Sequence, residues 1–346
     1  WQWNPLLDDD YEGDPAFADW ANVMMTPCIA DVTGPGGVPD GVPEVIFGST
    51  SNTGGGSDLV GVLRVVAGST GDEWFSVLDD GLRITTSTHP AVGDIDGDGL
   101  PEILCGAPGR FVRVFEHDGT FKWDSEVGNL VSGYEGITLA NLDAPGVDPL
   151  PEIIVGDTVL NRDGTVRWDQ SQSPNLFRIS IPVDYDLDGD VEIVAPPQVY
   201  DSTGAVELTL GGSYPAVGDF DDDDFAEIVS VGDGIVNLYD DDGSLVWSVP
   251  IPGGGVGGPP TVADFDNDGA PEVGVVGATQ YIVIDGTGGD AGTILWQRTV
   301  SDTSSNRTGS SVFDFEGDGF ADVVYRDQFV LYLFDGATGA DKAAPI

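Results

Sequence analysis

The chain has 346 residues, of which 60 are Asp or Glu and only 12 are Lys or Arg, so its formal net charge is −48. A surface this negative repels polyanions, which argues against nucleic acid and against an anionic membrane surface as partners. No apolar run approaches the roughly 20 residues of a membrane span, so we also expect no membrane insertion.

In chain order, a lead-in over residues 1–23 comes first, and a repeating unit follows it. The units begin near residues 26, 89, 136, 179, 214, 259 and 309, which gives a period of about 47 residues. Apolar residues show no helical period, and Gly and Pro are abundant. A repeat of this length and composition is typical of β-propellers rather than of helical solenoids.

Five units carry the same nine-residue loop near their start, with acids at loop positions 1, 3, 5 and 9. The loops read DIDGDGLPE, DYDLDGDVE, DFDDDDFAE, DFDNDGAPE and DFEGDGFAD. Calcium takes about six to eight oxygen ligands at flexible geometry, so alternating carboxylates on a tight turn suit it. The predicted ligands are Asp94, Asp96, Asp98 and Glu102; Asp184, Asp186, Asp188 and Glu192; Asp219, Asp221, Asp223 and Glu227; Asp264, Asp266, Asp268 and Glu272; and Asp314, Glu316, Asp318 and Asp322.

The surroundings of these loops distinguish them from EF-hands. The first half of each loop is similar to an EF-hand loop, but the closing acid stands at position 9 rather than 12. The flanking segments are short, apolar and β-rich, so we expect the loops to join strands. The alternative, that the acids only keep tight turns soluble, does not account for the fixed spacing.

Two further units carry longer versions of the loop. NLDAPGVDPLPE offers Asn141, Asp143 and Glu152, and DVTGPGGVPDGVPE offers Asp31, Asp40 and Glu44. Inserted residues can either supply ligands or replace the ion. We therefore expect about five Ca²⁺ sites, and up to seven.

A second signature follows each loop: an apolar strand, an Asp-Gly turn and a strand that carries Trp. Asp-Gly between alternating apolar runs is a strong hairpin signal. The Trp residues are Trp123, Trp168, Trp247 and Trp296, with Trp74 in a looser copy, Leu208 in the fourth unit and Lys342 at the matching place in the last. Each unit therefore predicts four antiparallel strands, and we expect the Trp side chains to pack between units.

Together these patterns predict an all-β fold, a seven-bladed β-propeller of four-stranded antiparallel blades, with most calcium loops between the first two strands of a blade. The expected domain organisation is a single propeller over residues 1–346. The aromatic segment at Trp1–Trp3 has no blade of its own, so we expect it to join the last blade and close the ring.

The segment DIDGDGLPEILCGAP, from Asp94 to Pro108, closely resembles the FG-GAP repeat of integrin α-subunits and of bacterial and archaeal VCBS-type proteins. The other copies match through the acidic loop and the strand after it, so the resemblance runs from about Thr26 to Ile346. It implies a calcium-stabilised propeller, usually extracellular and often adhesive, with Ca²⁺ held by loop positions 1, 3, 5 and 9. Members include receptors, lectins and accessory domains of enzymes, so the resemblance fixes no single activity.

Catalytic motifs are scarce, and we expect no enzyme. His89 and His117 stand in no triad or zinc spacing, and Cys28 and Cys105 are better explained as small buried residues than as a disulfide. Acid pairs for glycoside cleavage stay open as an alternative, because an acidic chain offers many.

Long connectors rich in Gly and Ser, at residues 49–58, 251–260 and 300–310, are expected at the end of the blades opposite the calcium loops. We expect this connector face to bind a protein or glycan partner. Three readings follow: an extracellular or cell-surface recognition module, a self-associating subunit of a surface layer or filament, and a polysaccharide-active enzyme. Extracellular calcium levels favour export. The acidity fits either a high-salt habitat or a secreted protein that uses charge to stay soluble.

Overall fold

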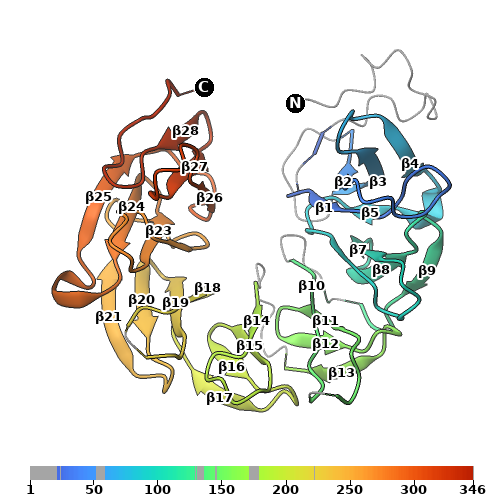
Figure 1. The fold of residues 1–346 in the computed structure, drawn as a ribbon, viewed down its shortest axis with the longest axis horizontal. Coiled ribbons are helices and arrows are strands. Elements are labelled where there is room, and N and C mark those ends of the chain that lie inside the picture. The colour runs from blue at the N-terminus through green and yellow to red at the C-terminus, as the bar shows by residue number, and fades with distance from the viewer. Residues whose placement is uncertain are drawn as a thin grey trace. The chain divides into compact units, whose positions relative to one another are not determined.

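The computed structural model describes residues 22–23, 25–51, 59–128, 130, 136–144, 146–170, 179–221 and 223–345. Within these residues the helical structure consists of two short 3-10 turns, η2 (Asp80–Leu82) and η3 (Gly288–Asp290). The strands form seven antiparallel sheets, which we name blades 1 to 7 in chain order (Figure 1). The expected fold class is confirmed.

The chain divides into two compact units, residues 1–180 and 181–346. Three blades belong to the first unit. Blade 1 contains β1 (Cys28–Ala30), β2 (Glu44–Ser49), β3 (Val60–Ala67), β4 (Glu73–Val77) and the short β5 (Ile84–Thr85), which pairs with β3; blade 2 contains β6 (Ala91–Gly93), β7 (Glu102–Ala107), β8 (Phe111–Phe115) and β9 (Phe121–Asp124); blade 3 contains β10 (Thr138–Ala140), β11 (Glu152–Val155), β12 (Thr158–Leu160) and β13 (Val166–Asp169).

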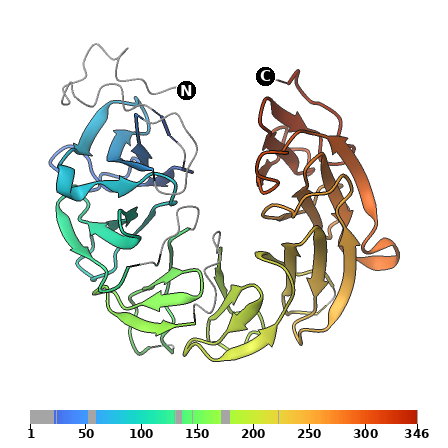
Figure 2. The same ribbon diagram turned by 180° about the vertical axis from the view of Figure 1, so that it is seen from behind.

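Four blades belong to the second unit, coloured from yellow to red in Figure 2. Blade 4 contains β14 (Ile181–Val183), β15 (Glu192–Ala195), β16 (Gln198–Tyr200) and β17 (Val206–Thr209); blade 5 contains β18 (Tyr214–Gly218), β19 (Glu227–Gly232), β20 (Ile235–Tyr239) and β21 (Leu245–Pro250); blade 6 contains β22 (Thr261–Ala263), β23 (Glu272–Val276), β24 (Gln280–Asp285) and β25 (Ile294–Thr299); blade 7 contains β26 (Ser310–Phe313), β27 (Asp322–Arg326) and β28 (Leu331–Phe334).

Strand order within each blade follows the chain, so neighbouring strands are joined by short loops. The acidic loop joins the first strand to the second, and the Asp-Gly turn joins the third to the fourth. In blade 5, Gly218 pairs with Glu227 and Ile228 pairs with Tyr239, so both loops lie at one end of the blade. The connectors over residues 251–260 and 300–310 lie at the other end, as the topology predicts.

Hydrophobic cores lie between consecutive blades of each unit. One cluster joins blades 1 and 2 around Ile46, Leu63 and Ile103, and another joins blades 6 and 7 around Tyr281 and Phe334. First strands of successive blades contact each other within each unit: β6 contacts β1 and β10, and β22 contacts β18 and β26. Within each unit, consecutive blades therefore bury apolar faces against each other, as expected for stacked β-sheets.

The predicted packing of the Trp side chains between blades is confirmed for Trp123, Trp247 and Trp296. The indole of Trp123 lies against Gly164 in the Asp-Gly turn of the next blade, and Trp247 and Trp296 lie against Gly292 and Gly339 in the same way. Trp247 Nε1 also donates to the Gly286 carbonyl at 3.1 Å. These turn glycines have φ of +68° to +83°, a conformation that L side chains rarely adopt.

Two positions assigned from the sequence are wrong by one residue. In blade 1, Phe75 rather than Trp74 packs into the core, while Trp74 stays 41% exposed. In blade 7, Phe334 pairs with Asp341, and Lys342 N donates to the Leu333 carbonyl. This register places Lys342 one residue before the Trp position. Both errors come from a hairpin turn that is one residue longer: Ala67 N and Asp335 N donate to carbonyls five residues ahead, at Asp72 and Ala340, whereas Glu116 N in blade 2 donates to Thr120, four residues ahead.

Blade 7 has three strands among the described residues. On the outer edge of its last strand, β28, Phe334 forms an isolated bridge with Asp341. Trp1 and Trp3 lie outside the described residues, so the expected closing strand stays a prediction. The same holds for the single domain over residues 1–346.

Candidate metal centres

The acid at loop position 9 begins the second strand of every blade. These residues are Glu44, Glu102, Glu152, Glu192, Glu227, Glu272 and Asp322. All seven are buried, with 8% exposure or less, although a carboxylate at a strand end would ordinarily stay in water. Buried carboxylates need partners, so these positions must be satisfied by the protein or by a bound cation.

One oxygen of the position 9 glutamate is used to hold the loop. Glu102 Oε2 accepts from Ile95 N at 2.9 Å, Glu272 Oε2 accepts from Phe265 N at 2.6 Å, and Glu152 Oε2 accepts from Leu142 N at 2.8 Å. The second oxygen, Oε1, is left for another partner. Asp322 departs from this pattern, because its shorter carboxylate accepts from Gly336 N at 3.4 Å instead.

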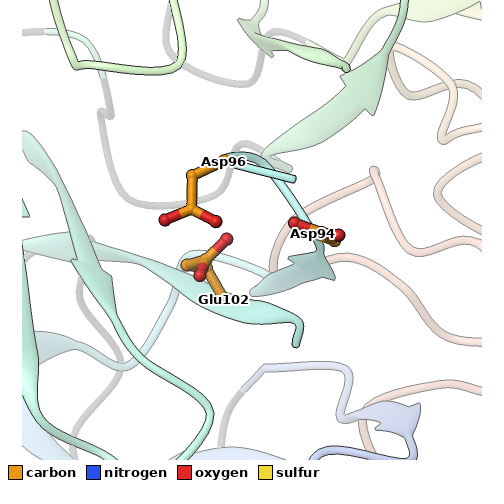
Figure 3. A group of neighbouring side chains, drawn as sticks. All are labelled: Asp94, Asp96 and Glu102. Atoms are coloured by element: carbon orange, nitrogen blue, oxygen red, sulfur yellow. The ribbon is translucent and has the colours of Figure 1, made fainter. Parts of the chain in front are cut away.

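The structure brings acids from loop positions 1, 3 and 9 together in four blades. Within each group, one carboxylate oxygen from every residue lies within 4.8 Å of the others. Figure 3 shows the blade 2 group, in which Asp96 and Glu102 face each other beside Asp94. Three hard oxygens at this separation could hold a divalent cation such as Ca²⁺. The groups are Asp94, Asp96 and Glu102; Asp184, Asp186 and Glu192; Asp219, Asp221 and Glu227; and Asp264, Asp266 and Glu272.

The position 5 acids are not members of these groups. Asp98 Oδ1 accepts from Leu100 N at 2.8 Å, and Asp223 Oδ1 accepts from Phe225 N at 2.8 Å. Such bonds to the backbone two residues ahead stabilise a turn. Ligation by position 5 stays a prediction, and the structure gives these acids a turn-forming role.

The groups in blades 4, 5 and 6 each contain a buried carboxylate oxygen that has no hydrogen-bond partner. These atoms are Asp184 Oδ1, Glu227 Oε1 and Asp264 Oδ1. Glu227 is 2% exposed, so its unpartnered oxygen has lost water without gaining a donor. In blade 2, by contrast, both oxygens of Asp94 accept backbone N–H groups, from Gly97 and Gly99. The donor chemistry and the orphaned oxygens together fit a bound cation.

The position 9 glutamates of the same three groups have raised pKa values. Burial raises the pKa of Glu192 to about 8, with a further contribution from the negative charges of Asp186 and Glu207. Burial likewise raises the pKa values of Glu227 and Glu272 to about 7, and the neighbouring loop aspartates add to the effect. A divalent cation would relieve both causes, because it supplies positive charge and replaces the lost hydration.

Three other blades carry a basic side chain beside the position 9 acid. Lys122 Nζ lies 2.7 Å from Asp96 Oδ2 and 3.2 Å from Glu102 Oε1. Lys342 Nζ lies 2.7 Å from Asp322 and also contacts Glu316. Burial alone would lower the pKa of Lys122, but its hydrogen bonds to the surrounding carboxylates raise that pKa well above its usual value.

Blade 3 has the same arrangement with a guanidinium. Arg167 lies 2.9 Å from Asp143 and 3.0 Å from Glu152. The third predicted ligand of this loop, Asn141, donates instead to the Asp148 carbonyl at 2.7 Å. None of the three was predicted from the sequence to pair with a loop acid, although the basic residue directly before the Trp in blades 2 and 3 was a visible signal.

The long loop of blade 1 is held together by the backbone. The Asp31 carboxylate accepts from Asp40 N and Gly41 N at 3.0 and 2.6 Å, and Glu44 Oε2 accepts from Val32 N and Thr33 N. Among the described residues, the loops of blades 1, 3 and 7 form no group of three acids like the four above. Their predicted ligands stay predictions.

The remaining candidate residues lie apart from these loops. His117 Nε2 lies 3.1 Å from the Gly37 carbonyl, and burial lowers the pKa of His89. Cys28 and Cys105 are free thiols packed in the core between blades 1 and 2.

In the described part of the chain, no helix has the length and apolar composition that crossing a membrane requires.

Comparison with family models confirms the expected resemblance in blade 2, where residues 88–120 match the FG-GAP repeat. This segment contains the loop from Asp94 to Glu102 and the Asp-Gly turn of the same blade. A search of curated protein sequences finds no significant match to the chain.

Several solved structures share the fold. The biofilm matrix protein Bap1 of V. cholerae aligns with a TM-score of 0.75 and 18% identity, over 96% of this chain and 82% of Bap1. The exotype rhamnogalacturonan lyase YesX aligns with a TM-score of 0.58 and 17% identity, over 90% of this chain and 62% of the lyase. A rhamnogalacturonan lyase of Bacillus licheniformis gives 0.56 and 16%, over 87% and 58%. This chain spans less than two thirds of either lyase.

Proposed function

We propose that this chain is an extracellular recognition module in which Ca²⁺ stabilises a β-propeller and the connector face binds a glycan. The observation that carries the calcium part is the set of buried, unpartnered carboxylate oxygens in blades 4, 5 and 6. Sites of this kind fill at the millimolar calcium of extracellular fluids, which supports export. The shared fold with a biofilm matrix protein supports the same location.

The connector face of the second unit supports the recognition part. Buried Asp302 accepts from Thr308 N at 3.0 Å, from the Thr308 hydroxyl at 2.9 Å and from the Ser305 hydroxyl at 2.8 Å. These bonds fix the loop over residues 301–309, whose tip exposes Thr303 and Ser304. A pre-ordered loop loses less entropy on binding.

Contacts between the connectors decide which residues can be replaced in a test of binding. The Asn306 side chain lies against Gly255 of the connector over residues 251–260, and Arg307 hydrogen-bonds Tyr214, so their replacement would disturb packing as well as binding. Most of the connector over residues 49–58 lies outside the described residues. The exposed tip at Thr303 and Ser304 is therefore the place to probe binding.

An array of acidic and neutral polysaccharides, probed with the calcium-loaded protein, tests the proposal. We expect binding to at least one glycan, and a loss of roughly tenfold or more in Ser304→Arg with an unchanged melting temperature. Ser244→Arg is the matched control, because Ser244 is exposed in the Asp-Gly turn at the opposite end of blade 5. Equal losses in both variants, or no glycan bound by the wild type, would contradict the proposal.

A structural subunit is the second candidate, favoured by the edge of blade 7. Within the described residues, the outer edge of β28 pairs only near Asp341, and an unpaired strand edge can accept a strand from another copy. Light scattering that shows concentration-dependent polymers would favour this candidate over a monomeric recognition module. We rank polysaccharide cleavage third, and turnover of a glycan on the array would move it to first.

A further inference from the structure

The last strand of each blade contains a bulge at one equivalent position, and the residue at this position differs among blades. In blade 2, Val114 pairs with Trp123 and Phe115 pairs with Phe121, so Lys122 is the extra residue. The same shift in register leaves Arg167 extra in blade 3, Val246 in blade 5 and Leu295 in blade 6. Trp74 and Glu207 hold this bulge position in blades 1 and 4, and the hydrogen bond of Lys342 N places Lys342 there in blade 7.

The bulge residue faces the acidic loop of its own blade wherever it is basic. Lys122, Arg167 and Lys342 each contact the position 9 acid, at 3.2, 3.0 and 2.7 Å. Each also contacts a position 3 acid of the same loop, namely Asp96, Asp143 or Glu316. A positive group therefore stands between the two acids that a metal ion would bridge.

The amino-acid composition shows that lysine occurs only at this bulge position. The chain contains two lysines, and both stand at the bulge position. Elsewhere its basic residues are arginines, few in number against 60 acids.

The unpartnered oxygens follow the same division. In blades 2, 3 and 7, which have a basic bulge residue, no loop acid has a buried oxygen without a partner among the described residues. In blades 4, 5 and 6, where the bulge residue is Glu207, Val246 or Leu295, each loop has one such oxygen. Glu227 is the most buried of the three residues, at 2% exposure, whereas Asp184 and Asp264 are half-buried.

From this we propose that Lys122, Arg167 and Lys342 are tethered cations that take the place of Ca²⁺ in blades 2, 3 and 7, while blades 4, 5 and 6 bind the metal. The inference rests on the proposed calcium stabilisation, and it assigns a different source of positive charge to two sets of blades. In blades 2 to 7, the residue at the bulge position decides between the two sources; blade 1, with Trp74 at the bulge and no group of three acids among the described residues, belongs to neither set.

Counting bound calcium in matched variants tests the assignment. The readout is equilibrium dialysis against about 1 mM free Ca²⁺, with the melting temperature in chelator measured in parallel. We expect three ions in the wild type and four in Lys122→Met, because Asp94, Asp96 and Glu102 already lie within reach of one ion. Val246→Lys should bind two, because the new ammonium would lie beside Glu227 as Lys122 lies beside Glu102.

Val246→Met is the control for side-chain volume and should keep three ions. In chelator, Val246→Lys should melt higher than Val246→Met, and Lys122→Met should melt lower than the wild type. Five or more ions in the wild type, or three in both Lys122→Met and Val246→Lys, would overturn the inference. A wild type that binds no calcium would refute the proposed calcium stabilisation. The melting temperatures in chelator would then judge the tethered cations alone, and unchanged values would overturn them too.

Discussion

At the scale of single residues, the position 9 glutamate has two separate roles. Its Oε2 accepts a backbone N–H and holds the loop to the strand, while its Oε1 meets Lys122 in Glu102 and has no partner in Glu227. A glutamine can keep the first role, because its amide oxygen accepts the same hydrogen bond. It removes the charge on which the second role depends.

The raised pKa values of Glu192, Glu227 and Glu272 predict how pH acts on the metal-free protein. The pKa of each lies above the ordinary value of 4.5, at about 8 for Glu192 and about 7 for the other two. The folded state therefore binds protons more tightly than the unfolded state. Its extra stability is present below the ordinary value and is lost as pH rises through 7 and 8.

In chelator we expect the melting temperature to fall by about 5 °C between about pH 6 and pH 8.5, judged from typical melting entropies. Calcium should shrink this fall, because it binds the deprotonated carboxylates. The triple variant Glu192→Gln, Glu227→Gln, Glu272→Gln separates these sites from the general repulsion among 60 acids. Should that variant keep the full pH dependence, the three glutamates are not its source.

At the scale of elements, the Asp-Gly hairpin of one blade packs against the hairpin turn of the next blade. Its Trp packs on the turn glycine of the next blade, and the bulge before it turns the preceding residue toward the calcium loop. One strand thus supplies both the contact between blades and the residue that faces the loop of its own blade.

Removing the indole from this contact should destabilise the protein strongly. Trp247→Ala is expected to lower the free energy of unfolding by about 3–5 kcal/mol, because it opens a cavity and leaves the Gly286 carbonyl without its donor. Trp74→Ala is the matched control: Trp74 is 41% exposed at a bulge, and we expect a change below about 1 kcal/mol. Denaturant titration in calcium measures both, and comparable losses would show that the two Trp positions are not distinct.

The sequence predicts the loops, the strands and the Trp contacts well, because each depends on a local pattern that recurs along the chain. It does not predict which loops carry a tethered cation. Lys122 is 20 residues away from Glu102 in the chain, and only the register of β8 and β9 with its bulge brings them together. Hairpin turns that are one residue longer in blades 1 and 7 explain why counting from the turn misplaced Trp74 and Lys342.

At the scale of the whole molecule, the three metal-competent blades without a tethered cation all belong to the unit of residues 181–346. Blades 2 and 3, which have tethered cations, belong to the unit of residues 1–180. We therefore expect calcium to act unevenly along the chain. The net negative charge that remains after three Ca²⁺ ions bind fits either a high-salt habitat or a secreted protein that uses charge to stay soluble.

Hydrogen exchange measured by mass spectrometry, with calcium and with chelator, checks this uneven response. Backbone amides of blades 4, 5 and 6 should exchange faster after chelation, because local opening follows the loss of a stabilising ligand. Amides of blades 2 and 3 should change little. A uniform increase across both units would argue that all blades share one calcium dependence.

A crystal structure of the protein crystallised with calcium, with anomalous scattering data that locate the ions, tests most directly which blades bind calcium. We predict calcium peaks beside Glu192, Glu227 and Glu272, with Lys122, Arg167 and Lys342 still paired to their loop acids. A calcium ion beside Glu102 with Lys122 displaced, or no ion in blades 4, 5 and 6, would contradict it.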